Sequence, residues 1–324
     1  SSHYNQEFVM KPVNCPHHTQ IYNSRPRSYR DLPLRYMEST MQYRDEKPGE
    51  IGGLTRDRAI TVDDGHIFCR VDQIKEEAKN LGQIIQEFYS SFGMYGNHWV
   101  SLSVRDPENP KNYIGADADW VQAEQMLQEV SDDLGLNAKR MEGEAALYGP
   151  KLDYMFKDSM GKERQLATIQ IDFAMPKRFK LTYTDSDGSQ KSPVIIHRAI
   201  LGSYERFMAI LIEHFAGAFP TWLSPVQATI VPVSEKQNDF ALQLKKEIKA
   251  QVPNVRIELD TRSESMGKRI REASKQKVPY ILVVGDKEIE ANSVSVRGRD
   301  DEDLGSMPIA DFIEKIKQEI DSRK

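Results

Sequence analysis

The pattern of the sequence changes near residue 222, and this change most restricts the folds open to the chain. Before it, β-type runs are separated by long connections and by helical stretches. After the proline-bracketed segment 219–225, short strands and helices alternate up to residue 324. Such alternation is typical of a small α/β domain. We therefore predict two domains, residues 1–222 and 223–324.

The composition predicts a globular protein of the cytoplasm. The chain has 324 residues, of which 39% are hydrophobic and 29% charged, and it holds no apolar run long enough to span a membrane. Its first ten residues lack the basic and apolar parts of a signal peptide, and two cysteines are too few for a disulfide scaffold. The net charge of -5 argues against a nonspecific nucleic-acid binder but allows local basic patches.

Regular elements of the first part follow from hydrophobic periodicity. Two β-type runs flank the charged turn 47–54, and apolar residues recur at helical spacing in 71–93 and 197–217. The segment 185–190, DSDGSQ, reads as a hairpin turn. The predicted strands are 32–46, 55–69, 99–105, 152–158, 164–175 and 179–185.

The second part alternates regularly between the two kinds of element. Its predicted strands are 227–233, 255–261, 279–285 and 292–299, and its predicted helices are 235–251, 266–277 and 309–323. A mixed sheet with flanking helices is expected from this order.

Several cysteines and histidines could ligate a metal. Zinc in a catalytic site takes three protein ligands and keeps a fourth position open. No pair here has C-x-x-C or H-E-x-x-H spacing, so a zinc site, a Cys/His hydrolase, and a buried cysteine among hydrogen-bonded histidines all remain open. The candidates are Cys15, His17, His18, His66, Cys69, His98, His197 and His214.

A charged hairpin is the second candidate site. Arg44 and Glu46 are expected on one side of a strand, and Arg56 and Arg58 follow the turn. Guanidinium groups suit phosphate oxygens, and a carboxylate beside them can accept a hydrogen bond from an adenine amino group. No P-loop is present, and no G-x-G-x-x-G follows a strand, so the common nucleotide folds are not indicated. A solvated charged hairpin is the alternative.

A series of motifs occurs in the order found in threonyl-tRNA synthetases, and the chain resembles that family from about Lys11 to its end. Other class II synthetases share the arginine-rich hairpin and the last arginine-bearing helix. "NCP", "DDGHIFC" and "IHRAILGS" together distinguish the threonine enzyme. The motifs are KPVNCPHH, SYRDLPLRYMES, YRDEKPGEIGGLTRDRAITVDDGHIFC, ALYGPKLDY, IHRAILGSYERFMAILIEHFAGAFPTWLSPVQ and VPYILVVGDKEIE with VSVRGR and DLGSM.

The resemblance implies an α+β fold. A class II antiparallel sheet with flanking helices would be followed by a small α/β mixed-sheet anticodon-binding domain. It also implies a threonine–tRNA ligase that acts on ATP, L-threonine and tRNA(Thr), with Mg²⁺ accompanying ATP. The family is expected to be a homodimer built through its motif 1.

In that family, one zinc ion is held by residues that correspond to Cys15, His66 and His197. The open position would receive the amino nitrogen and the hydroxyl of threonine. Valine, which lacks the hydroxyl, would be rejected, although a purely apolar pocket discriminates poorly between isosteres. Serine keeps the hydroxyl and would be rejected only weakly.

The resemblance also assigns roles to residues of the ATP site. Arg44 corresponds to the arginine that holds the α-phosphate, and Glu46 to the acceptor for the adenine amino group. Arg56 would reach the phosphates, and Arg206 would pack over adenine and grip the γ-phosphate. Arg44 and Arg206 are therefore the expected catalytic residues.

Further roles concern the amino acid, the adenylate and the tRNA. Lys151 and Gln165 would lie near ATP and the adenylate. Residues Asp64, Tyr148 and Gln170 would form the threonine pocket. Glu288 and Arg297 match positions that are expected to read anticodon bases, since single-stranded RNA is recognised on exposed base edges.

The chain departs from the family pattern at four points. Because SSHYN resembles the start of a longer stretch, we expect the chain to lack motif 1, and we expect it to lack an N-terminal editing domain. The third point is a pair of residues beside the site, where Ile60 replaces an aromatic that stacks on adenine and Val62 replaces a glutamine. The fourth is His17, which replaces a glycine. Ile60 and Val62 keep a second hypothesis open, a catalytically weak paralogue that binds tRNA or amino acid. A prolyl or seryl enzyme is disfavoured by the three zinc positions.

Overall fold

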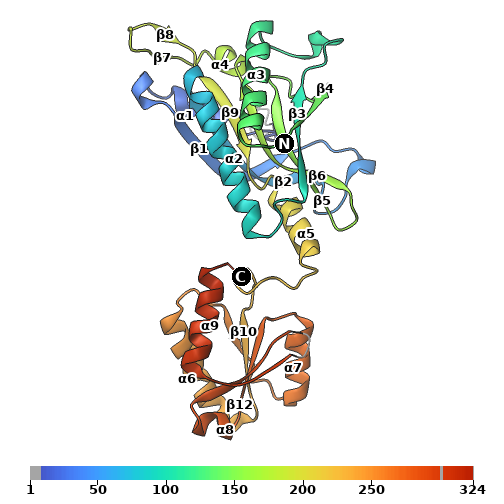
Figure 1. Cartoon of the computed structure of the whole chain (residues 1–324), viewed down its shortest axis with the longest axis vertical. Helices are drawn as coiled ribbons and strands as arrows, with labels where there is room; N and C mark the ends of the chain where they lie inside the picture. The colour runs from blue at the N-terminus through green and yellow to red at the C-terminus, as the bar shows by residue number, and fades with distance from the viewer. Residues whose placement is uncertain (1–8, 300–301, 324) are drawn as a thin grey trace, which may run out of the picture. The chain divides into compact units, whose positions relative to one another are not determined.

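The computed structural model describes residues 9–299 and 302–323, so the segment SSHYN lies outside the described residues. The chain divides into two compact units, Ser1–Leu211 and Ile212–Lys324. Each unit has its own sheet (Figure 1). No helix in the described ranges is long and apolar enough to cross a membrane.

Within the described residues, the first unit is built on a seven-stranded sheet with the order β1-β2-β9-β6-β5-β3-β4. Neighbouring strands run antiparallel except for the parallel pair β3 and β4. The predicted antiparallel sheet is thus confirmed. The strands are β1 (Leu34–Tyr43), β2 (Ala59–Cys69), β3 (His98–Val104), β4 (Lys139–Glu142), β5 (Lys151–Lys157), β6 (Glu163–Asp172) and β9 (Val194–Ala199).

Helices α2 (Ile74–Ser91) and α3 (Asp117–Asp133) pack together over one face of this sheet (Figure 1). The apolar stripe predicted for α2 faces inward, since Ile74, Ala78 and Ile85 are fully buried. Shorter elements complete the unit. They are α1 (Cys15–Asn23), α4 (Ala174–Arg178), the hairpin of β7 (Tyr183–Thr184) and β8 (Gln190–Lys191), and 3₁₀ turns at Tyr29–Asp31, Pro48–Glu50, Val71–Gln73 and Pro110–Asn112. Helix α5 (Tyr204–His214) begins in this unit and ends in the next.

The helix predicted over 197–217 was wrong in its first third. Strand β9 occupies Val194–Ala199, and α5 begins only at Tyr204. A short buried apolar run in a central strand cannot be distinguished from a buried helix by periodicity. Gly202 separates the two elements with φ +78°, where an added Cβ would lie 2.8 Å from the carbonyl oxygen of Leu166.

The second unit has a five-stranded mixed sheet in the described residues, with the order β11-β10-β12-β13-β14. β10 pairs in parallel with β11 and β12, and the pairs on the β13 side are antiparallel. The mixed sheet is confirmed. The strands are β10 (Ala228–Pro232), β11 (Ile257–Leu259), β12 (Tyr280–Val284), β13 (Ser293–Arg297) and β14 (Asp303–Pro308).

Helices cover both faces of this second sheet. Helices α6 and α9 bury Leu244, Ile248 and Phe312 against one face, and α7 buries Ile270 and Ala273 against the other. Sequence analysis missed α8 and β14, which are short. The helical elements are α6 (Asn238–Gln251), α7 (Met266–Lys275), α8 (Asp286–Glu290), α9 (Ile309–Asp321) and a 3₁₀ turn at Glu235–Gln237.

Candidate active site

A row of polar side chains crosses the sheet of the first unit. His66 on β2 pairs with His197 on β9, His197 pairs with Gln170 on β6, and Gln170 pairs with Lys151 on β5. Directly paired residues project from the same face of a sheet, so these four side chains form one line. Residues Ile169 and Ile171 alternate with Gln170 and are fully buried on the opposite face. Antiparallel pairing therefore gathers residues that are distant in the sequence.

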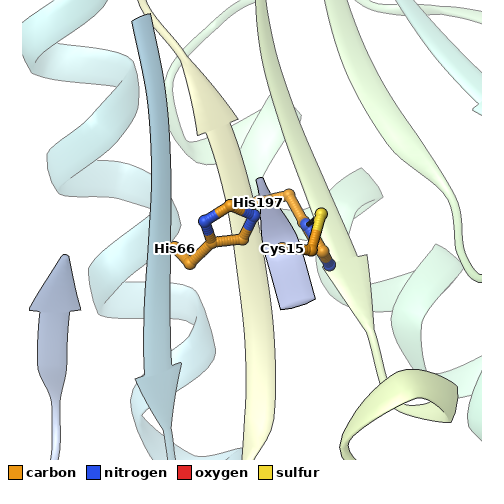
Figure 2. A group of neighbouring side chains, drawn as sticks. All are labelled: Cys15, His66 and His197. Atoms are coloured by element: carbon orange, nitrogen blue, oxygen red, sulfur yellow. Dashed lines mark hydrogen bonds between the residues drawn. The ribbon is translucent and has the colours of Figure 1, made fainter. Parts of the chain in front are cut away.

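The first helix brings Cys15 to the two paired histidines. Its Sγ lies 3.5 Å from Nδ1 of His197, although the two residues are 182 positions apart. Candidate ligand atoms of Cys15, His66 and His197 all lie within 4.8 Å of one another. The three side chains converge in Figure 2. Thiolate sulfur and imidazole nitrogen are the donors that zinc prefers, so this group could hold a metal ion.

The state of His66 fits a metal ligand. Its Nε2 is buried and has no hydrogen-bond partner among the described residues, whereas its Nδ1 lies 2.7 Å from Nδ1 of His18. Burial, with smaller contributions from His197 and His18, holds the pKa of His66 well below its ordinary value. The neutral imidazole is the form that binds metals, and a buried nitrogen without a hydrogen-bond partner is available for an ion.

His197 is oriented by a buried carboxylate. Its Nε2 lies 2.9 Å from Oδ2 of Asp172, and Oδ1 of Asp172 accepts hydrogen bonds from the backbone N–H groups of Ala174 and Met175. Burial lowers the pKa of His197, but Asp172 and Cys15 outweigh it and raise the pKa to about 10. A carboxylate on the far nitrogen is a common partner of a metal-bound histidine. Sequence analysis missed Asp172, although it lies two residues after Gln170 on β6 and therefore on the same face of the sheet.

The two adjacent histidines of α1, both candidate ligands from the sequence, lie in different surroundings. His17, the departure from the family pattern, is exposed at the surface of α1. His18 is buried and contacts His66, and its Nε2 lies 3.6 Å from Oε1 of Glu38. Consecutive residues of a helix point about 100° apart around its axis, so His17 and His18 cannot both face the sheet. His18, rather than His17, therefore contacts the candidate ligands, through His66.

One cavity of about 370 Å³ brings most predicted site residues together. It also exposes Ile60 and Val62, the two departures from the family pattern in β2. The lining includes Cys15, Arg44, Asp64, Tyr148, Lys151, Gln165, Gln170, His197 and Arg206.

Glu46 and Arg56 differ from expectation. β1 ends at Tyr43, so Arg44 and Glu46 both lie beyond the strand, in the connection to β2. The Arg56 Nε donates to Oε2 of Glu46 over 2.8 Å, and neither residue is among those lining the 370 Å³ cavity. Arg56 instead borders a neighbouring groove with Gln165 and Arg206. Hairpin loops are free to fold back on their own charges, which strand alternation cannot predict.

Arg206 closes the cavity from the start of α5. Its Nε donates to the carbonyl oxygen of Thr55 over 2.8 Å, and its Nη1 donates to the carbonyl oxygen of Gln165 over 3.2 Å. Burial and then the nearby Arg164 and Arg44 lower the pKa of Arg206, which still leaves a guanidinium charged. Arg206, held by two carbonyl oxygens, and Arg44 both line the cavity and give this part of it a positive charge that would attract a polyanion.

The opposite part of the lining suits an amino acid. The Tyr148 hydroxyl donates to Oε1 of Gln170 over 2.6 Å, and its ring stacks on His197 with centroids 4.6 Å apart. Asp64 accepts a hydrogen bond from Nε2 of Gln42 over 3.1 Å, and burial raises the pKa of Asp64. Acceptors beside a metal-capable group could bind an ammonium group and a hydroxyl.

The two predicted anticodon residues lie in the second unit. Oε2 of Glu288 accepts a hydrogen bond from the N–H of Gly285 over 2.9 Å, and so caps α8. Arg297 is half-buried on β13, and its Nε lacks a hydrogen-bond partner within the described chain. Their role in reading RNA stays a prediction.

Comparison with known proteins places this site and fold in a class. Residues 1–215 match the tRNA synthetase class II core domain (G, H, P, S and T), and residues 227–319 match an anticodon binding domain. A prolyl-tRNA synthetase from Cryptosporidium parvum shares the fold, with a TM-score of 0.68 at 18% identity over 96% of this chain and 58% of that one. The fold and the site thus define a class II aminoacyl-tRNA synthetase core with its anticodon-binding domain.

More similar relatives specify the group within the class. Threonine–tRNA ligases of Thermus thermophilus and Cytophaga hutchinsonii are 49% and 48% identical over 98% and 97% of the chain. The RNA binding domain of threonyl-tRNA synthetase from C. parvum has a TM-score of 0.86 at 35% identity, over 95% of this chain and 76% of that one. The chain belongs to the threonyl-tRNA synthetase family. It spans about half the length of the curated relatives it matches, 48% in both cases.

Proposed function

We propose that the chain activates threonine with ATP and transfers it to tRNA(Thr). The observation that carries this proposal is the single cavity lined both by Cys15 and His197 of the metal-capable group and by Arg44 and Arg206. A pocket with metal-ligating groups and arginines suits a small polar amino acid and a polyphosphate together. The family relationship supports the same assignment.

In the proposed reaction, the threonine carboxylate attacks the α-phosphorus of ATP and pyrophosphate leaves. No general base is needed, because the nucleophile is already an anion. Arg44 would hold the α-phosphate and Arg206 the γ-phosphate, so that attacking and leaving oxygens are in line. Mg²⁺, bound with ATP, would neutralise part of the phosphate charge. Lys151 and Gln165 would contact the adenylate, and Arg56 would reach the phosphates once released from Glu46.

Recognition of threonine would depend on the residues around the metal group. Cys15, His66 and His197 would hold zinc, which supplies coordination to the amino nitrogen and hydroxyl of the amino acid. Asp64 would accept a hydrogen bond from that hydroxyl, and Tyr148 with Gln170 would enclose the rest of the molecule. Rejection of valine would then follow from an unmet polar site rather than from shape.

Threonine-dependent exchange of pyrophosphate into ATP tests this proposal. The full chain should catalyse exchange with threonine, and substitution of Arg44 by Ala should abolish most of it. A chain that binds threonine and ATP in calorimetry but exchanges no pyrophosphate would be the binding paralogue. Ile60 and Val62 in the cavity wall are the observation that favours that second candidate. Restoring activity by an aromatic residue at position 60 would show that the substitution at this site limits catalysis.

A further inference from the structure

Asp153 is a buried carboxylate directly behind the cavity wall. It lies on β5, its residue surface is 3% exposed, and it is not among the residues that line the cavity. Oδ1 accepts hydrogen bonds from Nε2 of Gln165 at 2.7 Å and Oγ1 of Thr168 at 2.8 Å. Oδ2 accepts one from Oγ of Ser103 at 3.2 Å and pairs with Nζ of Lys151. Four donors therefore meet on one carboxylate.

Three of these donors belong to the cavity wall, and they extend the network further. Lys151, Gln165 and Thr168 all line the cavity. Thr168 Oγ1 also accepts a hydrogen bond from Nε2 of Gln170 at 3.1 Å, while Oε1 of Gln170 accepts one from Tyr148 at 2.6 Å. Each of these groups donates toward the next, so the series of hydrogen bonds from Tyr148 to Asp153 has a single consistent direction.

The chemistry of the cluster requires a carboxylate. An ionised Asp offers acceptors only, and all four of its neighbours present donors to it. An asparagine would turn one oxygen into an NH₂ group, which would oppose either the lysine ammonium or the glutamine amide. Buried donors that lose their acceptor are costly, and hydrogen bonds to a charged group are the strongest of these contacts. Lys151 and Gln165 would then leave their present positions.

We propose that Asp153 is a positioning residue that holds the amino-acid side and the ATP side of the cavity in a fixed relation. This rests on the proposed function, in which Tyr148 and Gln170 bind threonine while Lys151 and Gln165 serve ATP and the adenylate. Asp153 touches neither substrate. It fixes Lys151 and Gln165 directly, and it reaches Gln170 through Thr168.

The test compares variants of the full chain in pyrophosphate exchange, with KM for threonine and for ATP measured separately. Asp153→Asn should lower kcat/KM roughly 10- to 100-fold and raise both KM values, because hydrogen bonds to a charged group are lost on both sides. Lys151→Ala should raise mainly the KM for ATP, and Gln170→Ala should raise mainly the KM for threonine. Adding Lys151→Ala to Asp153→Asn should change the ATP KM little further, since coupled residues are not additive.

Two further variants separate positioning from mere stability. Ser103→Ala removes a donor from the same carboxylate, but Ser103 does not line the cavity. This variant should therefore lower the temperature of thermal unfolding at most and leave both KM values unchanged. Thr168→Val keeps the shape of the side chain but disconnects Gln170 from Asp153. It should raise the threonine KM and leave the ATP KM as it was. This variant keeps the test decisive if Asp153→Asn does not fold.

The outcomes distinguish this inference from the proposed function. Absence of exchange in the unmodified chain would refute the function. In that case, calorimetric affinities for ATP and for threonine in the unmodified chain and the variants would still show whether Asp153 acts on both sides of the cavity. Asp153→Asn that binds both ligands normally, or that affects one of them alone, would overturn the inference. A Thr168→Val variant with an unchanged threonine KM, or unchanged threonine binding, would overturn it too.

Discussion

Nε2 of His197 lies 2.9 Å from Oδ2 of Asp172, and this pair leaves Nδ1 of the same ring facing Cys15. Asp172 is fully buried and is itself fixed by two backbone N–H groups. Asp172 therefore fixes the ring orientation of His197 without a metal ion. Preorganisation of this kind strengthens a metal site because less order must be imposed on binding.

Substitution of Asp172 by Asn should weaken zinc binding 10- to 100-fold, the range typical of such outer partners. Competition with a chromophoric chelator would measure the affinity. Asp158→Asn is the matched control, because Asp158 is also a buried carboxylate next to β5 but accepts its hydrogen bonds from Arg164 and a turn. Equal zinc affinity in the Asp172 variant and the control would contradict the assigned role.

Cys15→Ser should reduce the zinc content of the purified protein from about one ion per chain toward none. A hydroxyl is a much poorer zinc ligand than a thiolate, and two imidazoles alone bind the ion weakly. Elemental analysis gives the content directly. Cys69→Ser serves as the control, since Cys69 is fully buried outside the group. Full zinc content in the Cys15 variant would remove the metal assignment.

Selectivity among amino acids should follow the hydroxyl group. Valine should be activated very poorly, since a site built for a polar group discriminates by roughly 10⁴ or more in favourable cases. Serine loses only a methyl contact, worth about 1 kcal/mol, and should be activated and transferred to tRNA measurably. Pyrophosphate exchange with the three amino acids, followed by charging with labelled serine, measures both steps. If valine matched serine, the group of Cys15, His66 and His197 would not read the hydroxyl.

Arg297→Ala should reduce tRNA charging while adenylate formation stays nearly intact. Loss of one base contact should cost about 1–3 kcal/mol, by analogy with base readout in DNA. Lys317→Ala, an exposed basic residue on α9 of the same unit, is the control for general charge. Equal losses in both half-reactions would place Arg297 in folding or in the active site instead.

Glu319 should make the stability of the second unit depend on pH. Burial raises its pKa, but hydrogen bonds from Thr221, Tyr280 and Lys315 outweigh this and lower the pKa below its ordinary value of 4.5. A carboxyl whose pKa is lower in the folded state than in the unfolded state stabilises the fold at pH values above 4.5. This contribution is lost as the pH falls through the pKa of Glu319 in the folded protein. Glu319→Gln should therefore destabilise the protein by about 1 kcal/mol at neutral pH.

Thermal unfolding at neutral pH and near pH 3 measures this dependence. The difference between Glu319→Gln and the unmodified chain should shrink at the lower pH. Glu314→Gln, on the exposed side of the same helix, should show no comparable change. A constant difference across the pH range would mean that Glu319 acts through packing and not through its charge.

Local patterns in the sequence were enough for the strongly periodic elements. The hairpin of β1 and β2, the helix α2 and most of the second unit followed from alternation, helical spacing and turn residues. The end of strand β9 was included in the helix predicted over 197–217, because its apolar run is buried in the middle of a sheet. Sequence analysis did not predict helices α3 and α8 or strand β14.

The sequence by itself determined which residues could carry chemistry, since side-chain type and motif order singled out Cys15, His66 and His197. Only the tertiary structure decided what surrounds them. His66 and His197 are neighbours because β2 and β9 pair in one register, and a slip of one residue would turn one of them to the opposite face. The roles of His18, Asp172 and Asp153 depend likewise on which donors burial brings within hydrogen-bonding distance. That distance is set by packing between remote segments, which no local pattern encodes.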